Sequence, residues 1–239
     1  MPLMRQWDLR NSDACLSTLL IIQCLMTFVL VPLVAVHLIS PRATDAGLLC
    51  FVIVCAVVYV ERARTLLALL GSVLAVLSGP YLWSHQSVHD ASSRVTLHET
   101  ILAAALLFNM LITALVTQHT FSAGPVTRHR ILGAILVYLN VAVVCSILYD
   151  FLDTMLGGSM RFSSGALLSL DMGARQADFT YFSLVTITTC GYGDIVPVHP
   201  FVRSLANVEA LFGQLFPATF VARLVALHLS RDGGAGPEH

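Results

Sequence analysis

Six long apolar stretches limit what this chain can fold into. They cover approximately residues 15–39, 46–60, 65–83, 98–118, 131–151 and 201–229. A helix needs about 20 apolar residues to cross a hydrocarbon core about 30 Å thick, and it satisfies its own backbone hydrogen bonds in lipid. The sequence therefore predicts an all-α membrane protein with six transmembrane helices. The second stretch, at about fifteen residues, is short and requires tilt or local thinning of the bilayer.

Composition supports a membrane protein and argues against several other classes. Hydrophobic residues make up 56% of the chain and charged residues 11%, with a mean hydropathy of +0.80, a balance that soluble domains do not have. A formal net charge of −1 without a basic patch argues against a nucleic-acid partner. No nucleophile–base pair or metal constellation stands out, so we expect neither an enzyme nor a cofactor.

Arginine placement predicts the orientation in the membrane. If all six stretches cross the membrane, six arginines lie on the same side of it, namely Arg5, Arg10, Arg62, Arg64, Arg128 and Arg130. The positive-inside rule makes that side the cytoplasm, which also places both termini there. Residues 84–97 and 152–200 then face outward. The absence of lysine beside abundant arginine, alanine and leucine is typical of a GC-rich bacterial genome, so we expect a bacterial inner (plasma) membrane.

A short segment near residue 190 has the residue order that a cation path requires. It reads Thr188-Thr189-Cys190-Gly191-Tyr192-Gly193-Asp194. A dehydrated cation needs closely spaced oxygens, and successive carbonyls turn toward one axis only where residues tolerate positive φ. Gly191 and Gly193 tolerate it, and Thr189 can add a hydroxyl oxygen. The segment therefore points to a potassium-selective pore.

This segment resembles the filter of the potassium channel superfamily, which usually reads Thr-Val-Gly-Tyr-Gly-Asp. The resemblance extends over residues 131–229 and implies a re-entrant pore helix, a selectivity-filter loop and a tetrameric pore in which carbonyl rings replace the hydration shell of K⁺. The implied K⁺ ligands are Thr189, Cys190, Gly191 and Tyr192. Gly193 completes the filter and shapes the outer mouth together with Asp194.

Cys190 departs from the usual motif, which has valine or isoleucine at this place. Its carbonyl would still face the ions, and we expect its thiol to pack behind the filter as a small buried hydrophobe. A redox-sensitive conductance is the alternative.

The residues before the filter predict a short pore helix. Asp178 is a plausible N-cap for a helix over residues 179–188. Tyr181 and Phe182 stand where the resemblance places an aromatic collar, and Tyr181 can bond Asp194. With Thr188, these residues form the expected support of the filter.

The last apolar stretch resembles an inner pore helix. Gly213 lies at the spacing of a gating hinge, and Pro217, four residues later, crowds the glycine carbonyl; a static kink is the alternative. Gln214 is expected to line the cavity. Glu209 is expected to pair with backbone or a neighbouring subunit rather than with ions.

The chain also divides into regions. We expect a four-helix N-terminal membrane domain over residues 1–118, a cytoplasmic linker over 119–130, the pore domain over 131–229 and a short cytoplasmic tail over 230–239. The fourth span carries no lysine or arginine, so it lacks the charges with which a conventional voltage sensor collects energy from the field.

Polar residues gather around the second outward loop. They are His85, His89, Asp90, His98 and Glu99. A solvated connector is the expected role, and a zinc or proton sensor is the alternative.

One filter segment per chain predicts a homotetramer around a fourfold axis, because a closed ring needs four. The predicted function is passive conduction of K⁺ across the membrane through this carbonyl filter, and membrane lipid is an expected partner of the protein. Two alternatives are a weakly selective cation pore and a non-conducting membrane sensor or regulatory subunit.

Overall fold

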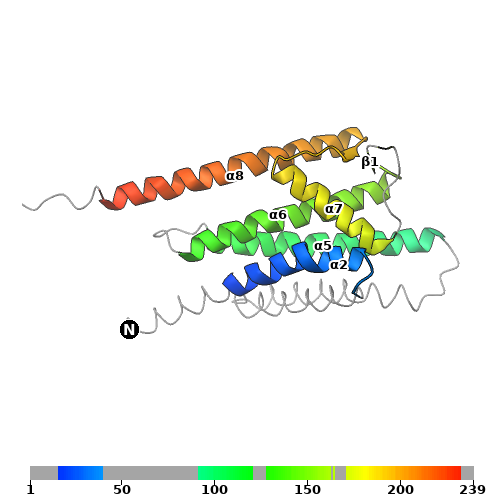
Figure 1. Cartoon of the computed structure of the whole chain (residues 1–239), viewed down its shortest axis with the longest axis horizontal. Helices are drawn as coiled ribbons and strands as arrows, with labels where there is room; N and C mark the ends of the chain where they lie inside the picture. Colours follow the sequence, from blue (N-terminus) through cyan, green and yellow to red (C-terminus); the bar gives the residue numbers. More distant parts are fainter. Residues whose placement is uncertain (1–15, 40–90, 121–127, 163, 165–170, 233–239) are drawn as a thin grey trace, which may run out of the picture.

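A computed structural model gives the structure of the chain, and it describes residues 16–39, 91–120, 128–162, 164 and 171–232 (Figure 1). Among these residues, four helices are long and apolar enough to cross a membrane. They are Leu16–Ala35, His98–Gln118, Arg130–Met155 and Pro200–Ala226. They correspond to the first, fourth, fifth and sixth predicted spans. The second and third predicted spans lie outside the described residues.

The first span contains a local change of helical type. A π-helical turn, η1 (Met26–Leu30), precedes the α-helical segment α2 (Val31–Ala35). Pro32 lies at the junction and has no N–H to donate to the preceding turn. A widened turn is a common way for a helix to accommodate such a residue.

Two long helices pack beside the first span. They are α5 (Ala91–Thr120) and α6 (Arg128–Met155), which run side by side in Figure 1. Leucines of the first span and residues of α5 and α6 share one apolar core, formed by Leu16, Leu19, Phe108, Ile112, Val116, Leu136 and Val137. A polar contact crosses the α5–α6 interface, because Asn140 Nδ2 donates to Thr113 Oγ1 at 2.6 Å.

A compact arrangement of short elements follows α6. Strand β1 (Met160–Phe162), helix α7 (Met172–Ile187) and strand β2 (Ile195–Pro197) precede the long helix α8 (Pro200–Asp232). The two strands are antiparallel, with Arg161 paired to Val196. Figure 1 shows α7 crossing between α6 and α8 at this end of the molecule. A second apolar core holds these elements together, formed by Tyr149, Met160, Phe179, Phe182, Ile195 and Val202.

Helix α7 differs from the predicted pore helix at its start. It begins at Met172, and its N-cap is Asp171, whose side chain accepts a hydrogen bond from Ala174 N at 2.9 Å. Asp178, the predicted N-cap, lies inside the helix. The prediction was wrong because Asp171 and Asp178 are chemically equal candidates for a cap, and sequence alone does not show which one has free N–H groups beside it.

Candidate functional site

The backbone of the candidate filter alternates between two conformations. Positive φ angles occur at Thr189 (59°), Gly191 (57°) and Gly193 (75°), whereas Cys190 and Tyr192 between them have negative φ. Such alternation turns successive peptide planes to the same side of the chain. Positive φ is unfavourable for a β-branched threonine, so Thr189 is held in this conformation by its surroundings.

Filter N–H groups donate back to the end of α7. The N–H groups of Cys190 and Gly191 reach the carbonyl of Val185 at 3.0 and 3.3 Å, and the N–H of Thr189 reaches that of Thr186 at 2.9 Å. The C=O of a peptide points opposite to its N–H. The carbonyls of Thr189 and Cys190 therefore point away from α7, as a row of ion ligands requires.

The remaining carbonyls at the end of α7 are also paired. Leu184 accepts from the N–H and the hydroxyl of Thr188 at 3.1 and 2.7 Å. Ile187 accepts from the hydroxyl of Tyr138 on α6 at 2.9 Å. The last four carbonyls of a helix lack partners within the helix. In α7 each of the four accepts a hydrogen bond from the candidate filter segment or from α6. These bonds join α7, the candidate filter and α6.

Tyr181 supports the outer end of the filter through two contacts. Its hydroxyl donates to Asp194 Oδ2 at 2.7 Å, the contact expected from the sequence, and its ring stacks on Tyr192 with centroids 6.5 Å apart. Asp194 also accepts from the N–H of Ile195 at 3.0 Å. Donation to Asp194 raises the pKa of Tyr181 to about 12, so this hydroxyl remains protonated throughout the physiological range.

Phe182 faces a different way from its neighbour. It is buried and meets the ring of Tyr149 on α6 edge-on, with centroids 5.0 Å apart. In this chain Phe182 therefore attaches α7 to α6, and Tyr181 contacts the candidate filter.

Cys190 is exposed in the single chain, whereas a buried thiol was expected. The whole segment of residues 188–194 is exposed in the single chain, so one chain alone does not bury the Cys190 side chain.

Gly213 has a steric role that the sequence did not reveal. A Cβ atom at this position would lie 1.8 Å from the carbonyl oxygen of Ile187, far inside contact distance. Glycine therefore permits α8 to approach the end of α7. Helix α8 continues through Pro217, and Gln214 is exposed in the single chain. A hinge at Gly213 and Pro217 and a cavity role for Gln214 stay predictions.

Glu209 pairs with side chains of its own chain. It is 2% exposed and accepts a hydrogen bond from the hydroxyl of Tyr149 at 2.6 Å. Its other oxygen lies 2.5 Å from the hydroxyl of Ser183 on α7. Glu209 therefore joins α6, α7 and α8.

An ionic clamp at the start of α7 is a feature that sequence reasoning missed. Arg175 contacts Asp150 at 2.5 Å and Asp153 at 3.0 Å, both on α6. Asp153 also accepts from the N–H groups of Ser159 and Met160, at 2.5 and 2.9 Å, at the start of the segment leading to β1. These bonds and the β1–β2 pairing fix the backbone of residues 159–162.

One member of the predicted histidine cluster joins this clamp. His98 Nε2 on α5 lies 3.6 Å from Asp150 Oδ1. His85, His89 and Asp90 lie outside the described residues. Within the part of the chain that the structure describes, no group of three potential ligands could hold a metal ion.

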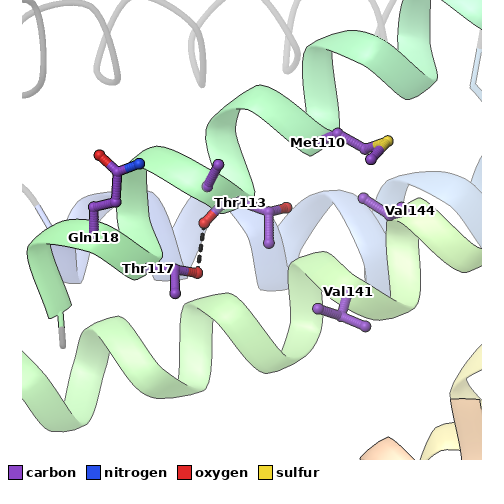
Figure 2. A pocket seen from close by; sticks show the side chains of 7 residues that line it. Met110, Thr113, Thr117, Gln118, Val141 and Val144 are labelled. Atoms are coloured by element: carbon purple, nitrogen blue, oxygen red, sulfur yellow. Dashed lines mark hydrogen bonds between the residues drawn. The ribbon is translucent and has the colours of Figure 1, made fainter.

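A shallow pocket of about 440 Å³ lies between α5 and α6, away from the filter. Figure 2 shows its lining residues, which are Met110, Thr113, Ala114, Thr117, Gln118, Val141 and Val144. The threonine hydroxyls there bind their own helix, with Thr117 donating to the Thr113 carbonyl at 2.6 Å. None of these lining side chains is charged.

Comparison with known proteins gives a match over the part of the chain that contains the candidate filter. Residues 133–228 match a family model described as "Ion channel". Neither the curated proteins nor the solved structures give a match to this chain. The matched region contains the candidate filter, α7 and most of α6 and α8.

Proposed function

We propose that this chain is a K⁺-selective channel that conducts passively across a membrane, and the match of residues 133–228 to the ion channel family model supports the proposal. The observation that carries the proposal is the alternation of φ along Thr189–Gly193. Together with N–H groups that donate back to α7, it leaves filter carbonyls pointing away from the helix. K⁺ would bind at Thr189, Cys190, Gly191 and Tyr192.

A homotetramer is the assembly that we propose. A single chain supplies one filter strand, and its residues 188–194 are exposed. Large apolar side chains on α8 are exposed as well, namely Phe201, Val208, Leu211, Leu215, Val221 and Val225. Four copies around one axis would close the filter into a ring and cover part of this surface with protein.

The proposed gating does not rely on a conventional voltage sensor. The span His98–Gln118 contains no lysine or arginine. Each elementary charge crossing the membrane field supplies about 2.3 kcal/mol per 100 mV, and this span has no basic side chain to move. From the arginine distribution, we place both termini on the cytoplasmic side of the membrane. The absence of lysine favours a bacterial inner membrane.

The test is the reversal potential of the purified protein in a planar bilayer under a K⁺-to-Na⁺ gradient. The proposal expects a value near the K⁺ equilibrium potential, lost in Gly191→Ala, because alanine at this φ is strained by about 1–2 kcal/mol. A reversal potential near zero would indicate a weakly selective cation pore. An intact tetramer without flux at any voltage or pH would indicate a non-conducting sensor.

A further inference from the structure

A buried carboxyl group lies behind the pore helix, where three helices meet. Glu209 of α8 is 2% exposed, and Ser183 of α7 is fully buried. One carboxyl oxygen accepts from the Tyr149 hydroxyl at 2.6 Å, and the other lies 2.5 Å from Ser183 Oγ. A carboxyl group in an apolar span is costly unless it is neutral or fully paired, so its protonation state matters.

Counting protons at Ser183 determines that state. Its Oγ lies 2.7 Å from the carbonyl oxygen of Ala142 on α6 and 2.5 Å from Glu209 Oε1. A hydroxyl has one proton and can donate to only one of these two oxygens. If Glu209 were ionised, the Ser183 hydroxyl could donate to either the Ala142 carbonyl or Glu209 Oε1. The other oxygen would then face Ser183 Oγ at hydrogen-bond distance with no proton between them, and two such acceptors repel each other.

A protonated Glu209 satisfies every contact. Its O–H donates to Ser183 Oγ, the Ser183 hydroxyl donates to the Ala142 carbonyl, and the Tyr149 hydroxyl donates to the other Glu209 oxygen. Each donor then has one acceptor, and no charge is buried. The result is a directional chain of hydrogen bonds from α8 through α7 to α6.

We propose that Glu209 is a neutral positioning residue, whose proton holds the pore helix against α6 and α8 and thereby maintains the geometry of the selectivity filter. This inference rests on the proposed function, because it assigns a role in selectivity. Ser183 precedes Ile187, the last residue of α7, by one helical turn. Glu209 itself is enclosed by helices, so it does not act as an ion ligand.

The groups that face Glu209 are compatible with a neutral acid. On α6 they are Tyr149, Cys145 and, at greater distance, Tyr138, all of which are neutral at physiological pH. On α7 the facing group is the hydroxyl of Ser183. The charged groups of the pore helix clamp, Arg175 with Asp150 and Asp153, pair with one another.

Three variants separate a proton donor from a charge or a space-filling group. In Glu209→Gln, the amide N–H replaces the acid O–H as donor to Ser183, and the amide oxygen still accepts from Tyr149. We expect a K⁺/Na⁺ permeability ratio within about twofold of the unmodified channel. Glu209→Leu and Ser183→Ala break the chain, and leaving buried groups unpaired lowers the ratio roughly tenfold. An equal loss in Glu209→Gln, or an unaffected Glu209→Leu, would overturn the proposal.

The pH dependence adds a readout that packing alone would not change. Deprotonation of Glu209 at high pH removes the donor to Ser183, so selectivity of the unmodified channel falls as the pH rises. Glu209→Gln has no proton to lose there and keeps its selectivity. A fall of the same size in both proteins would count against Glu209 as the titrating group.

Infrared spectroscopy of the full-length protein in membranes tests the proton without any current. At neutral pH we expect a carbonyl band of a protonated carboxylic acid, which Glu209→Gln removes and the control Glu99→Gln retains. An unmodified protein without this band would refute the neutral acid. If the band is present but the protein does not select K⁺, the proposed function fails while the protonation state stands.

Discussion

The Cα atom of Gly213 packs against the carbonyl group of Ile187, so closely that a Cβ atom would lie 1.8 Å from the oxygen. This contact places the middle of α8 directly on the end of α7. The same carbonyl accepts the hydroxyl of Tyr138 at 2.9 Å. One backbone oxygen at the base of the filter is thus held by both α6 and α8.

Substitution of Gly213 by alanine should separate α8 from α7. The added methyl group cannot fit, and overpacking of this kind costs about 1–3 kcal/mol or more. We expect a lower melting temperature of the assembled protein and a loss of current. The matched control is Ala218→Gly, at an exposed site of the same helix, which should cost only about 1 kcal/mol. A Gly213→Ala protein of normal stability with altered opening would instead favour a hinge.

Removal of the Tyr181 hydroxyl should weaken the outer mouth. Tyr181→Phe deletes the donor to Asp194 but keeps the ring that stacks on Tyr192. We expect faster loss of current during sustained opening, measured in bilayers at constant voltage. Asp194→Asn keeps an acceptor oxygen and should have the milder effect. Identical decay in all three proteins would mean that this bond does not support the filter.

The same bond predicts a response to alkaline pH. Only the protonated Tyr181 hydroxyl donates, and donation to Asp194 raises the pKa of Tyr181 to about 12 from 10.0. Because the pKa is raised in the folded state, the Tyr181–Asp194 hydrogen bond stabilises the fold fully below pH 10.0. This stabilisation is lost as the pH rises through about 12. The difference between the unmodified protein and Tyr181→Phe in sustained current should therefore be constant up to about pH 10 and vanish above about pH 12.

Loss of the Arg175 side-chain charge should be severely destabilising. Arg175→Gln leaves Asp150 and Asp153 nearly buried without their cation, and breaking such a pair typically costs about 3–5 kcal/mol. The measurement is the unfolding midpoint of the purified protein. Arg161→Gln, on the exposed face of β1, removes an arginine nearby and should change stability by about 0.5 kcal/mol or less. Equal effects of the two substitutions would contradict a specific clamp.

Replacement of Cys190 by valine should leave conduction unchanged. In the proposed filter this position contributes only its backbone carbonyl, and valine provides the same carbonyl. We expect an unaltered reversal potential in bilayers, with and without a thiol oxidant. A redox response that is present in the unmodified protein and absent in Cys190→Val would instead support a thiol-sensitive conductance.

Local chemistry made several features of this protein predictable from sequence. Apolar length identified the four spans that the structure describes, and the positive φ angles at Gly191 and Gly193 occur where glycine removes the steric penalty. The hydrogen bond between Tyr181 and Asp194 was also predictable, because the resemblance to potassium channels placed both residues at a known spacing. These properties depend on single residues or on short segments.

The tertiary structure alone decided the contacts between distant segments. Arg175 meets Asp150, and Glu209 meets Tyr149 and Ser183, across 25 to 60 positions of sequence. Nothing in the residue types distinguishes these partners from other polar residues of the helices. Hydropathy and backbone preference act locally, so the sequence by itself determined the four described spans and the positive φ angles at Gly191 and Gly193. Tertiary contacts determined the positive φ of Thr189, which buried side chain meets which, and why position 213 must be glycine.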